Sequence, residues 1–374
     1  MPYEGLHSSL ATKDPVATAR QAGLQYVSDL MPGITRRRCG QGFSYRNPDG
    51  SCVKDPATLD RIRRLAIPPA WTGVWICPLP GGHLQATGRD EKGRKQYLYH
   101  ELWTQLRNRS KFDRLVDFAY TLPLIWEVTD RHLQQPALDR QRVLAAVVRL
   151  LEQTLIRVGN EEYARENQHY GLTTLRRHHV AIKGAHLHFE FEGKSGVAHE
   201  VELRDPAIAK VVKGCQQLPG EELFKYVDEF GTPHVVTSAD VNGYLRAITG
   251  QEYTAKDFRT WAGTLYGALE LALQGPSSSE REARRKINAA VKAVAERLHH
   301  TPTVCRKYYI HPRVLNAYTE GLLLEVLCDG GVCEVDDLEL ARDGYRLDPK
   351  ELALLELLEG RARKRSVSAA TIAA

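Results

Sequence analysis

The sequence lacks any run of 18 apolar residues, and its N-terminus has no charged segment followed by an apolar one. We therefore expect neither a membrane span nor export. Seven cysteines occur at irregular spacings without a Cys-x-x-Cys pair, so neither a zinc site nor a disulfide framework is favoured, and a reducing cytoplasm is the simplest setting. The sequence also has no acidic cluster suited to a metal ion. We expect no metal and no other cofactor.

The composition is typical of a soluble globular protein, and the length of 374 residues allows two ordinary domains. Its formal net charge of +5 is mild, but the charge is unevenly distributed. Residues 320–359 are acidic, whereas residues 36–64, 89–114 and 281–313 are basic. This segregation fits a protein with one face toward a polyanion and another toward solvent.

The most informative stretch is 298–312, with the sequence Leu-His-His-Thr-Pro-Thr-Val-Cys-Arg-Lys-Tyr-Tyr-Ile-His-Pro. One helix is predicted to end near Leu298, and Thr301-Pro302 is typical of an N-cap followed by proline at the first position of the next helix. That second helix is predicted to carry Tyr309. Between positions 281 and 313 there are nine Lys or Arg and two Glu. A tyrosine in such surroundings, with His300 before it, suits nucleophilic attack on a phosphate, although a partly buried tyrosine on a basic helix gives the same pattern.

The N-terminal part is predicted to be a small α+β domain, with a helix at 56–65 capped by Asp55 and strands at 71–78 and 83–87. Four basic residues crowd the turn that follows, and Tyr97 and Tyr99 alternate onto one face of the next strand. Cations beside flat rings suit a nucleic-acid surface. A solvated loop with a core tyrosine pair is the open alternative.

From about residue 101 the apolar residues recur at helical spacing, so the second part is predicted to be mainly helical. Arg-Asn-Arg-Ser-Lys at 107–111 is interpreted as the linker between the two parts. Residues 171–203 interrupt the helices with short antiparallel strands, predicted at 172–175, 179–182, 187–191 and 197–203. Lys194 lies on the predicted hairpin turn of this sheet.

Three further cations are candidates for phosphate chemistry. Arg157 follows a strongly apolar helix, Arg259 lies near the start of a long helix, and Lys194 is on its hairpin tip. An arginine offers a fork of donors to phosphate oxygens, and a lysine can give up a proton. Solvated surface cations are the plain alternative. A nucleotide-binding loop is excluded at Lys194, because His188 stands where a glycine is required.

Taken together, residues 24–325 resemble the type IB DNA topoisomerases, in particular the compact poxvirus-like form found in bacteria. Five motifs occur in the family's order, and their combination is specific although each alone is weak. They are Gly-His-Leu-Gln-Ala-Thr-Gly-Arg-Asp with Gly-Arg-Lys-Gln-Tyr, Arg157-Val-Gly-Asn, Gly193-Lys194, Lys256-Asp-Phe-Arg259-Thr, and His300-Thr-Pro with Tyr309 nine residues on. The resemblance implies that Tyr309 is the nucleophile; Tyr308 falls one residue short of the family spacing.

The resemblance also implies roles for the other four catalytic residues. Arg157, Arg259 and His300 would bind the non-bridging oxygens of a DNA phosphodiester, and Lys194 would protonate the leaving 5′-oxygen. The products would be a 3′-phosphotyrosyl bond and a free 5′-hydroxyl that can reverse the step without ATP or metal. Release of the 5′ end would let the cut strand rotate, so that supercoils relax.

The family fold implies α+β architecture: a small mixed β/α domain (1–110) and a mainly helical catalytic domain with a small antiparallel sheet (111–325). The C-terminal extension with a basic tail (326–374) departs from the family pattern. The two domains would form a C-shaped clamp around duplex DNA. The expected protein is a cytoplasmic, nucleoid-associated monomer. Its expected DNA contacts are Arg89, Lys92, Arg94, Gln96, Tyr97, Tyr99 and Tyr163.

Two alternatives from other classes stay open. A tyrosine site-specific recombinase has the same spacing of histidine and nucleophile, although Lys-Asp-Phe-Arg259 stands where recombinases have His-x-x-Arg. A non-catalytic DNA clamp would explain the basic surfaces but not the five reactive residues. Strand exchange between two DNAs would indicate a recombinase, and the absence of any covalent adduct would indicate a non-catalytic clamp.

Overall fold

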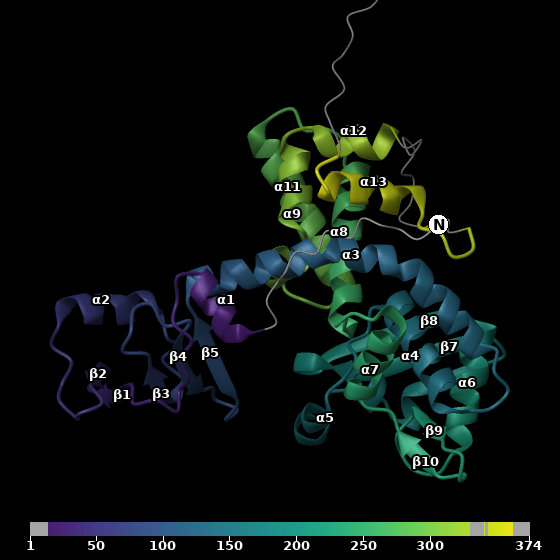
Figure 1. Cartoon of the computed structure of the whole chain (residues 1–374), viewed down its shortest axis with the longest axis horizontal. Coiled ribbons are helices and arrows are strands. Elements are labelled where there is room, and N and C mark those ends of the chain that lie inside the picture. Colours follow the sequence, from purple (N-terminus) through teal and green to yellow (C-terminus); the bar gives the residue numbers. More distant parts are fainter. Residues whose placement is uncertain (1–13, 330–339, 341–342, 362–374) are drawn as a thin grey trace, which may run out of the picture. The chain divides into compact units, whose positions relative to one another are not determined.

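The computed structural model describes residues 14–329, 340 and 343–361. The chain divides into two compact units, Met1–Asp113 and Arg114–Ala374, each described here by itself (Figure 1). The mixed α+β fold class predicted from the sequence is confirmed. The C-shaped clamp concerns the relative placement of the two units and stays a prediction. None of the helices in the described ranges is long and apolar enough to cross a membrane.

The N-terminal unit is built on a five-stranded antiparallel sheet with the order β2-β1-β3-β4-β5. Its elements are α1 (Pro15–Gln21), β1 (Ile34–Cys39), β2 (Gly42–Arg46), α2 (Pro56–Arg64), β3 (Thr72–Ile76), β4 (Leu84–Arg89) and β5 (Lys95–Tyr99). The predicted cap of α2 is confirmed, because the Asp55 carboxylate accepts from the Thr58 N–H at 2.8 Å.

Both faces of this sheet are covered around β3. Val74 and Ile76 pack with Ile62 of α2, while Trp75 and Cys77, which alternate with them, pack with residues of the opposite face. A strand buried on both faces carries apolar residues at consecutive positions. The sequence Val-Trp-Ile at the end of β3, followed by Cys77, has this pattern. The sheet therefore forms a rigid base for the turn and strand that follow.

Helix α3 (Glu101–Leu133) runs continuously through 107–111, so the predicted linker is not a break in the helix, although the division between the two units falls close to it, after Asp113. The segment Arg-Asn-Arg-Ser-Lys contains no glycine or proline, and nothing in it stops a helix. A polar segment of a helix and a linker can have the same composition, so composition alone does not distinguish them.

The second unit consists mainly of helices with two small sheets. After α3 come α4 (Arg140–Thr154), α5 (Glu161–Asn167), β6 (Val180–Lys183), β7 (His186–Gly193), β8 (Val197–Arg204), α6 (Pro206–Gln217), β9 (Lys225–Val227), β10 (Pro233–Val235), α7 (Ser238–Thr249), α8 (Ala255–Leu273), α9 (Glu280–Arg297), α10 (Pro302–Tyr308), α11 (Pro312–Thr319), α12 (Leu322–Asp329) and α13 (Pro349–Leu358). The three-stranded sheet has the order β6-β7-β8, and β9 pairs with β10.

One local prediction for this unit is corrected, and one hairpin was missed. Residues 172–175 do not form a strand, because Leu172–Thr174 is a 3₁₀ turn, η1. Its backbone bonds to the loop after α4, with Leu172 N donating to Arg157 O at 2.9 Å, instead of to a sheet. The β9–β10 hairpin was not predicted; its strands are too short to show a period of two.

The core of the second unit surrounds α4 and α8, which are buried along most of their length. Helix α8 packs against α4, α9, α11 and α13, so the C-terminal segment belongs to the same packed body (Figure 1). Glu351 of α13 is 0% exposed, and its carboxylate accepts from the Trp261 indole N–H at 3.2 Å. The predicted basic tail lies beyond Arg361, outside the described residues, as does Cys333.

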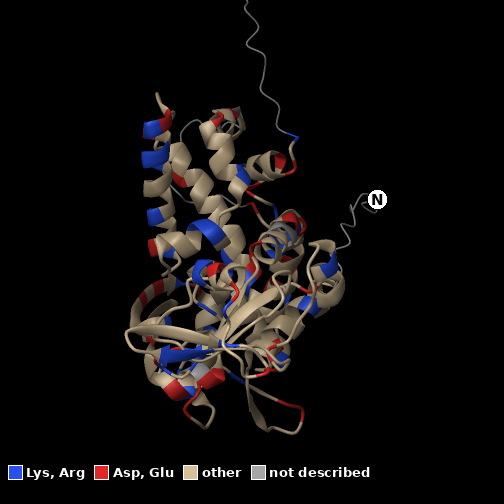
Figure 2. Ribbon diagram, turned by 90° about the vertical axis from the view of Figure 1, so that its left-hand side faces the viewer, with Lys and Arg blue, Asp and Glu red and all other residues tan. Residues whose placement is uncertain are grey.

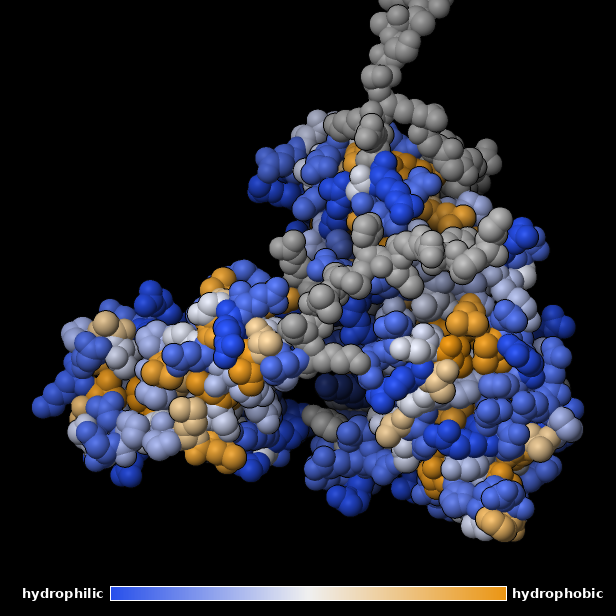
Figure 3. All heavy atoms as spheres, viewed as in Figure 1, coloured by the Kyte–Doolittle hydropathy of each residue, from blue (hydrophilic) through white to orange (hydrophobic). Residues whose placement is uncertain are grey.

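The surface is mainly polar. Hydrophilic residues cover most of the face in Figure 3, and the hydrophobic patches there are small and separated. Lys and Arg occur on the ribbons of both units, interspersed with Asp and Glu (Figure 2). The fold therefore offers no broad apolar face in this view, and its chemistry must be sought in particular polar clusters.

Candidate active site

Tyr309 lies directly after α10, as its C-cap residue. The helix begins as predicted, with Pro302 at its start and the Thr301 hydroxyl accepting from the Val304 N–H. The prediction that Tyr309 belongs to the helix is corrected by one residue. The Tyr309 carbonyl accepts from the Thr264 hydroxyl at 3.1 Å, and the side chain is only 9% exposed. The tyrosine is therefore fixed at both its backbone and its ring.

His300 lies in the turn between α9 and α10, beside the Tyr309 hydroxyl. The turn reverses at His299, which has a left-handed φ of 48°, and His300 N then donates to Ala295 O at 2.8 Å. This places His300 Nε2 3.2 Å from the Tyr309 hydroxyl, with the ring centroids 4.8 Å apart. Burial lowers the pKa of His300 to about 4, assisted by the charges of Arg157, Arg259 and Lys194. The imidazole is therefore neutral at physiological pH.

Arg157 reaches the same histidine from the loop after α4. Its Nη2 donates to His299 O at 2.9 Å and lies 3.1 Å from His300 Nε2. Because a guanidinium only donates, Nε2 is the acceptor in this contact. Burial lowers the pKa of Arg157, while the nearby Tyr309 acts in the opposite direction. Hydrogen bonds from η1 to the carbonyls of Arg157 and Val158 hold the loop in place.

Arg259 is buried behind the tyrosine, at 4% exposure, on the second turn of α8. Its Nη1 donates to Leu155 O and its Nη2 to Leu298 O, the C-cap residues of α4 and α9. Its Cζ lies 5.7 Å from the centroid of the Tyr309 ring. Burial first, and the charge of Arg157 second, lower its pKa to about 10, so the guanidinium stays charged.

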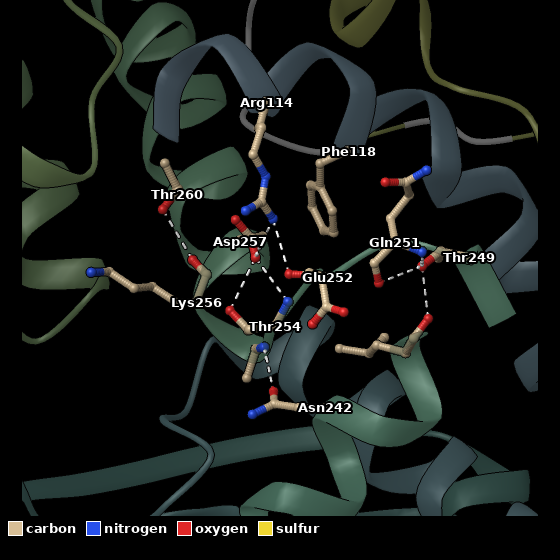
Figure 4. A network of polar contacts seen from close by, with 12 residues as sticks. Arg114, Phe118, Asn242, Thr249, Gln251, Glu252, Thr254, Lys256, Asp257 and Thr260 are labelled. Carbon is tan, nitrogen blue, oxygen red and sulfur yellow. Dashed lines mark hydrogen bonds and ion pairs between the residues drawn. The ribbon is translucent and has the colours of Figure 1, made fainter. Parts of the chain in front are cut away.

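The start of α8 is held by a polar network that fixes where Arg259 stands (Figure 4). Thr254 and Asp257 form a capping box, with the Asp257 carboxylate accepting from the Thr254 N–H at 2.8 Å. Arg114 donates to Glu252 O at 3.0 Å and lies 4.0 Å from the Asp257 carboxylate. The Asn242 side chain accepts from the first N–H of the helix, at 3.3 Å.

Lys194 lies on the tip between β7 and β8, in the one-turn segment η3 (Lys194–Gly196). The tip contains two residues with positive φ, Ser195 at 69° and Gly196 at 73°. Lys194 is exposed, and its charge contributes to the lowered pKa of His300. The hairpin predicted from the sequence is thus present, and it brings the lysine to the side of the unit that carries His300.

In the N-terminal unit, the predicted DNA contacts gather on the turn and strand around Asp90. The Asp90 carboxylate accepts from the backbone N–H groups of Lys92 and Arg94 at 3.0 Å and from the side chains of Arg94 and Gln96 at 2.8 and 2.9 Å. Arg89 donates to the carbonyl of Gly93, across the turn. One aspartate therefore organises the whole basic turn.

Tyr97 and Tyr99 project from β5 on one face, with their rings stacked at 9° and centroids 6.1 Å apart. Each is 46% exposed, so the alternative of a core tyrosine pair is wrong. Tyr163 is on α5, in the second unit, and its side chain lies outside what the structure describes. The candidate DNA contacts on β5 and the turn before it therefore gather in one place in the N-terminal unit, where both tyrosines are exposed.

Sequence reasoning missed several residues that build the site. Thr264 and Gly263 of α8 contact the backbone of Tyr309, and a Cβ at Gly263 would lie 2.8 Å from the Tyr309 carbonyl oxygen. The ring of His199 packs against that of His299, the residue before His300, with the centroids 4.0 Å apart. These contacts join distant positions of the chain and have no spacing signal. No group of His, Cys, Asp and Glu suited to a metal ion occurs among the residues described.

Comparisons with known proteins identify the family of the chain. A family model described as the catalytic core of eukaryotic DNA topoisomerase I matches residues 100–323, and one for the N-terminal domain of bacterial DNA topoisomerase IB matches residues 42–90. DNA topoisomerase 1B of Acanthamoeba polyphaga mimivirus is 34% identical over 296 residues, which cover 77% of this chain and 88% of the viral protein. DNA topoisomerase 1B of vaccinia virus is 25% identical over 247 residues, covering 64% and 74%. The chain, matched by these family models and relatives, belongs to the type IB DNA topoisomerases.

Proposed function

We propose that Tyr309 attacks a phosphodiester of duplex DNA and forms a 3′-phosphotyrosyl bond, freeing a 5′-hydroxyl. The observation that carries this proposal is the meeting of Arg157, Arg259 and His300 around one tyrosine, from three separate segments of the chain. Attack at phosphorus requires a nucleophile and groups that stabilise the negative charge on the phosphate oxygens. A tyrosine hydroxyl beside two arginines and a histidine can provide both.

The two arginines supply the positive charge for a transition state that gains negative charge. In the described part of the chain, neither Arg157 nor Arg259 forms an ion pair with a carboxylate; their hydrogen bonds go to carbonyls and to His300. Their charge is therefore not neutralised before DNA binds. A phosphate oxygen can take the place of a carbonyl on a guanidinium fork and gain charge-assisted bonds.

His300 changes its hydrogen-bonding role when DNA binds. Without DNA its Nε2 accepts from Arg157. A phosphate that takes the Arg157 bond frees Nε2, and the phosphate's negative charge opposes the causes that lower the pKa of His300. The imidazole can then carry a proton on Nε2 and donate it to a non-bridging oxygen, while the Tyr309 hydroxyl stays within hydrogen-bond distance.

Lys194 supplies the proton for the leaving group. An alkoxide leaves poorly, and general acid catalysis contributes about 10²- to 10⁴-fold in enzymes. Lys194 carries a transferable proton on a hairpin tip, whereas Arg157 and Arg259 are already engaged in hydrogen bonds to carbonyls and to His300. After transfer, the 5′-oxygen leaves as a hydroxyl, and the proton that the Tyr309 hydroxyl loses on attack passes to water. The neutral lysine can take the proton back when that hydroxyl attacks the phosphotyrosyl bond, so cleavage and religation use the same residue.

The cycle needs neither ATP nor metal, because the phosphotyrosyl ester conserves the energy of the broken bond and the charge is supplied by side chains. Rotation of the free strand between cleavage and religation relaxes supercoils. All five residues come from one chain, which supports action as a monomer. We assign the DNA duplex to the basic turn and tyrosine pair of the N-terminal unit as well, with Tyr163 as a further contact in the second unit.

The test is relaxation of a supercoiled plasmid by purified protein in EDTA without ATP, stopped with SDS to trap covalent adducts. The wild type and Tyr308→Phe should relax the plasmid and leave protein bound to the 3′ end of a nicked strand. Tyr309→Phe should do neither, while still binding DNA. Relaxation by the Tyr309 variant, or a wild type that binds without relaxing, contradicts the proposal.

A further inference from the structure

The hairpin that carries Lys194 is packed against a buried histidine that the reaction itself does not use. His199 lies on β8, opposite Phe191 of β7, and is 3% exposed. Its ring stacks on the Phe191 ring at 7°, with the centroids 4.8 Å apart. Gly193, the residue before Lys194, lies so close to the His199 ring that a Cβ there would overlap with it. The ring therefore fills the base of the hairpin tip.

The other side of the same ring contacts the turn that carries His300. The His199 and His299 rings lie 4.0 Å apart between centroids, at 47°. His299 is the residue with left-handed φ at the reversal between α9 and α10, and its carbonyl accepts from Arg157. One imidazole thus separates the hairpin of Lys194 from the backbone that positions His300 and Arg157.

We propose that His199 is a positioning residue that acts as a spacer, setting where the Lys194 hairpin stands relative to His300 and Arg157. This inference rests on the proposed function, in which Lys194 protonates the leaving oxygen.

The shape of the ring does the positioning. Its Nδ1 has no hydrogen-bond partner among the described residues, so hydrogen bonding at that atom does not hold the ring. Burial first, then His299 and the two arginines, lower its pKa to about 4, so it adds no charge beside them. A neutral flat ring is all that the contacts with Phe191, Gly193 and His299 require. Phenylalanine should therefore replace His199, whereas alanine should leave the hairpin without its support.

Displacement of the hairpin should affect proton transfer more than phosphate binding. Lys194 moves with the tip, while Arg157, Arg259 and Tyr309 are held by α4, α8 and α10 through bonds of their own. A displacement of about 1 Å in an active site can cost on the order of 10²-fold in rate. We expect His199→Ala to slow single-turnover cleavage by about 10- to 100-fold.

The experiment compares two DNA substrates that differ at the cleaved bond. One has the ordinary 5′-oxygen and the other a 5′-bridging sulfur, whose thiolate leaves without a proton because thiols are far stronger acids than alcohols. His199→Ala should be slow on the oxygen substrate and close to the wild type on the sulfur substrate, and Lys194→Ala should show the same difference. His199→Phe should cleave both substrates within about threefold of the wild type.

His132→Ala is the control, because His132 contacts the Tyr244 hydroxyl at 2.7 Å and is not part of the site; thermal unfolding of each variant reports folding. The inference would be overturned if His199→Ala cleaved both substrates equally slowly, or if it cleaved them at the rate of the wild type. It would also be overturned if His199→Phe were as slow as His199→Ala. If the wild type forms no adduct, the proposed function fails. If Lys194→Ala stays slow on the sulfur substrate, the lysine's role fails and the inference with it.

Discussion

Removal of Arg259 should destabilise the second unit as well as stop the proposed chemistry. The guanidinium binds the carbonyls of Leu155 and Leu298, which lie at the C-terminal ends of two helices. In Arg259→Ala both carbonyls would lose their donor in a buried place. A hydrogen bond to a charged group contributes about 1.5–3 kcal/mol, so the two together predict a loss of about 3–6 kcal/mol in the free energy of unfolding. That is a large fraction of the roughly 5–15 kcal/mol typical of a domain.

Urea denaturation followed by tryptophan fluorescence measures this loss, because Trp126 and Trp261 are buried in the same unit. Arg259→Lys keeps one charge but cannot bind both carbonyls, so its loss should lie between alanine and wild type. Arg246→Ala is the control; its ion pair with Glu252 is exposed and should contribute no more than about 1 kcal/mol. An Arg259→Ala variant within about 1 kcal/mol of the wild type would refute the view that this arginine joins two helix ends.

Three further predictions follow from other contacts. Gly263→Ala should slow cleavage by about 10- to 100-fold in single-turnover assays, because it displaces the carbonyl of Tyr309, the proposed nucleophile. Gly243→Ala, with open space around it, should not slow cleavage, and equal rates of the two variants would contradict the close contact. Because the pKa of His199 is about 4 when folded and 6.5 when unfolded, the unfolded chain takes up the proton first, and stability should fall between about pH 6.5 and 4, by up to about 3 kcal/mol. Urea denaturation at pH 7.5 and at pH 5 should show that the free energy of unfolding falls less in His199→Phe than in the wild type. An equal fall in both proteins would exclude His199 as the cause. In the N-terminal unit, Arg89→Ala should reduce the salt dependence of DNA binding by about one phosphate contact, while Tyr97→Ala should weaken binding without changing that slope, as a salt titration would reveal.

Much of the fold was accessible from sequence because its signals are local. The cap and proline at Thr301-Pro302, the glycine-rich tip at Lys194 and the alternation of Tyr97 and Tyr99 each depend on a few neighbouring residues, and the structure has all three. The errors are local as well. The polar segment 107–111 was interpreted as a linker although nothing in it breaks a helix, and Leu172–Thr174 has strand-like composition but bonds to a loop.

What the sequence could not predict is the contact between distant positions. The bond from Thr264 to Tyr309 spans 45 residues, and the two carbonyls on Arg259 are 104 and 39 residues away. Such partners depend on how α4, α8 and α9 pack, and a single sequence does not specify that packing. The family resemblance predicts which residues react, but the side chains and carbonyls that hold these residues in place were found only in the three-dimensional structure.

The site's construction from separate segments also bears on the safety of the cell. A newly made or damaged chain has its tyrosine but gains the surrounding arginines and histidine only when α4, α8 and the turn after α9 are all packed. In the proposed mechanism, a partly folded molecule therefore has the tyrosine that would bond to DNA but lacks the arginines and histidine that its attack requires. Cutting and rejoining a DNA strand would both depend on the same completed fold.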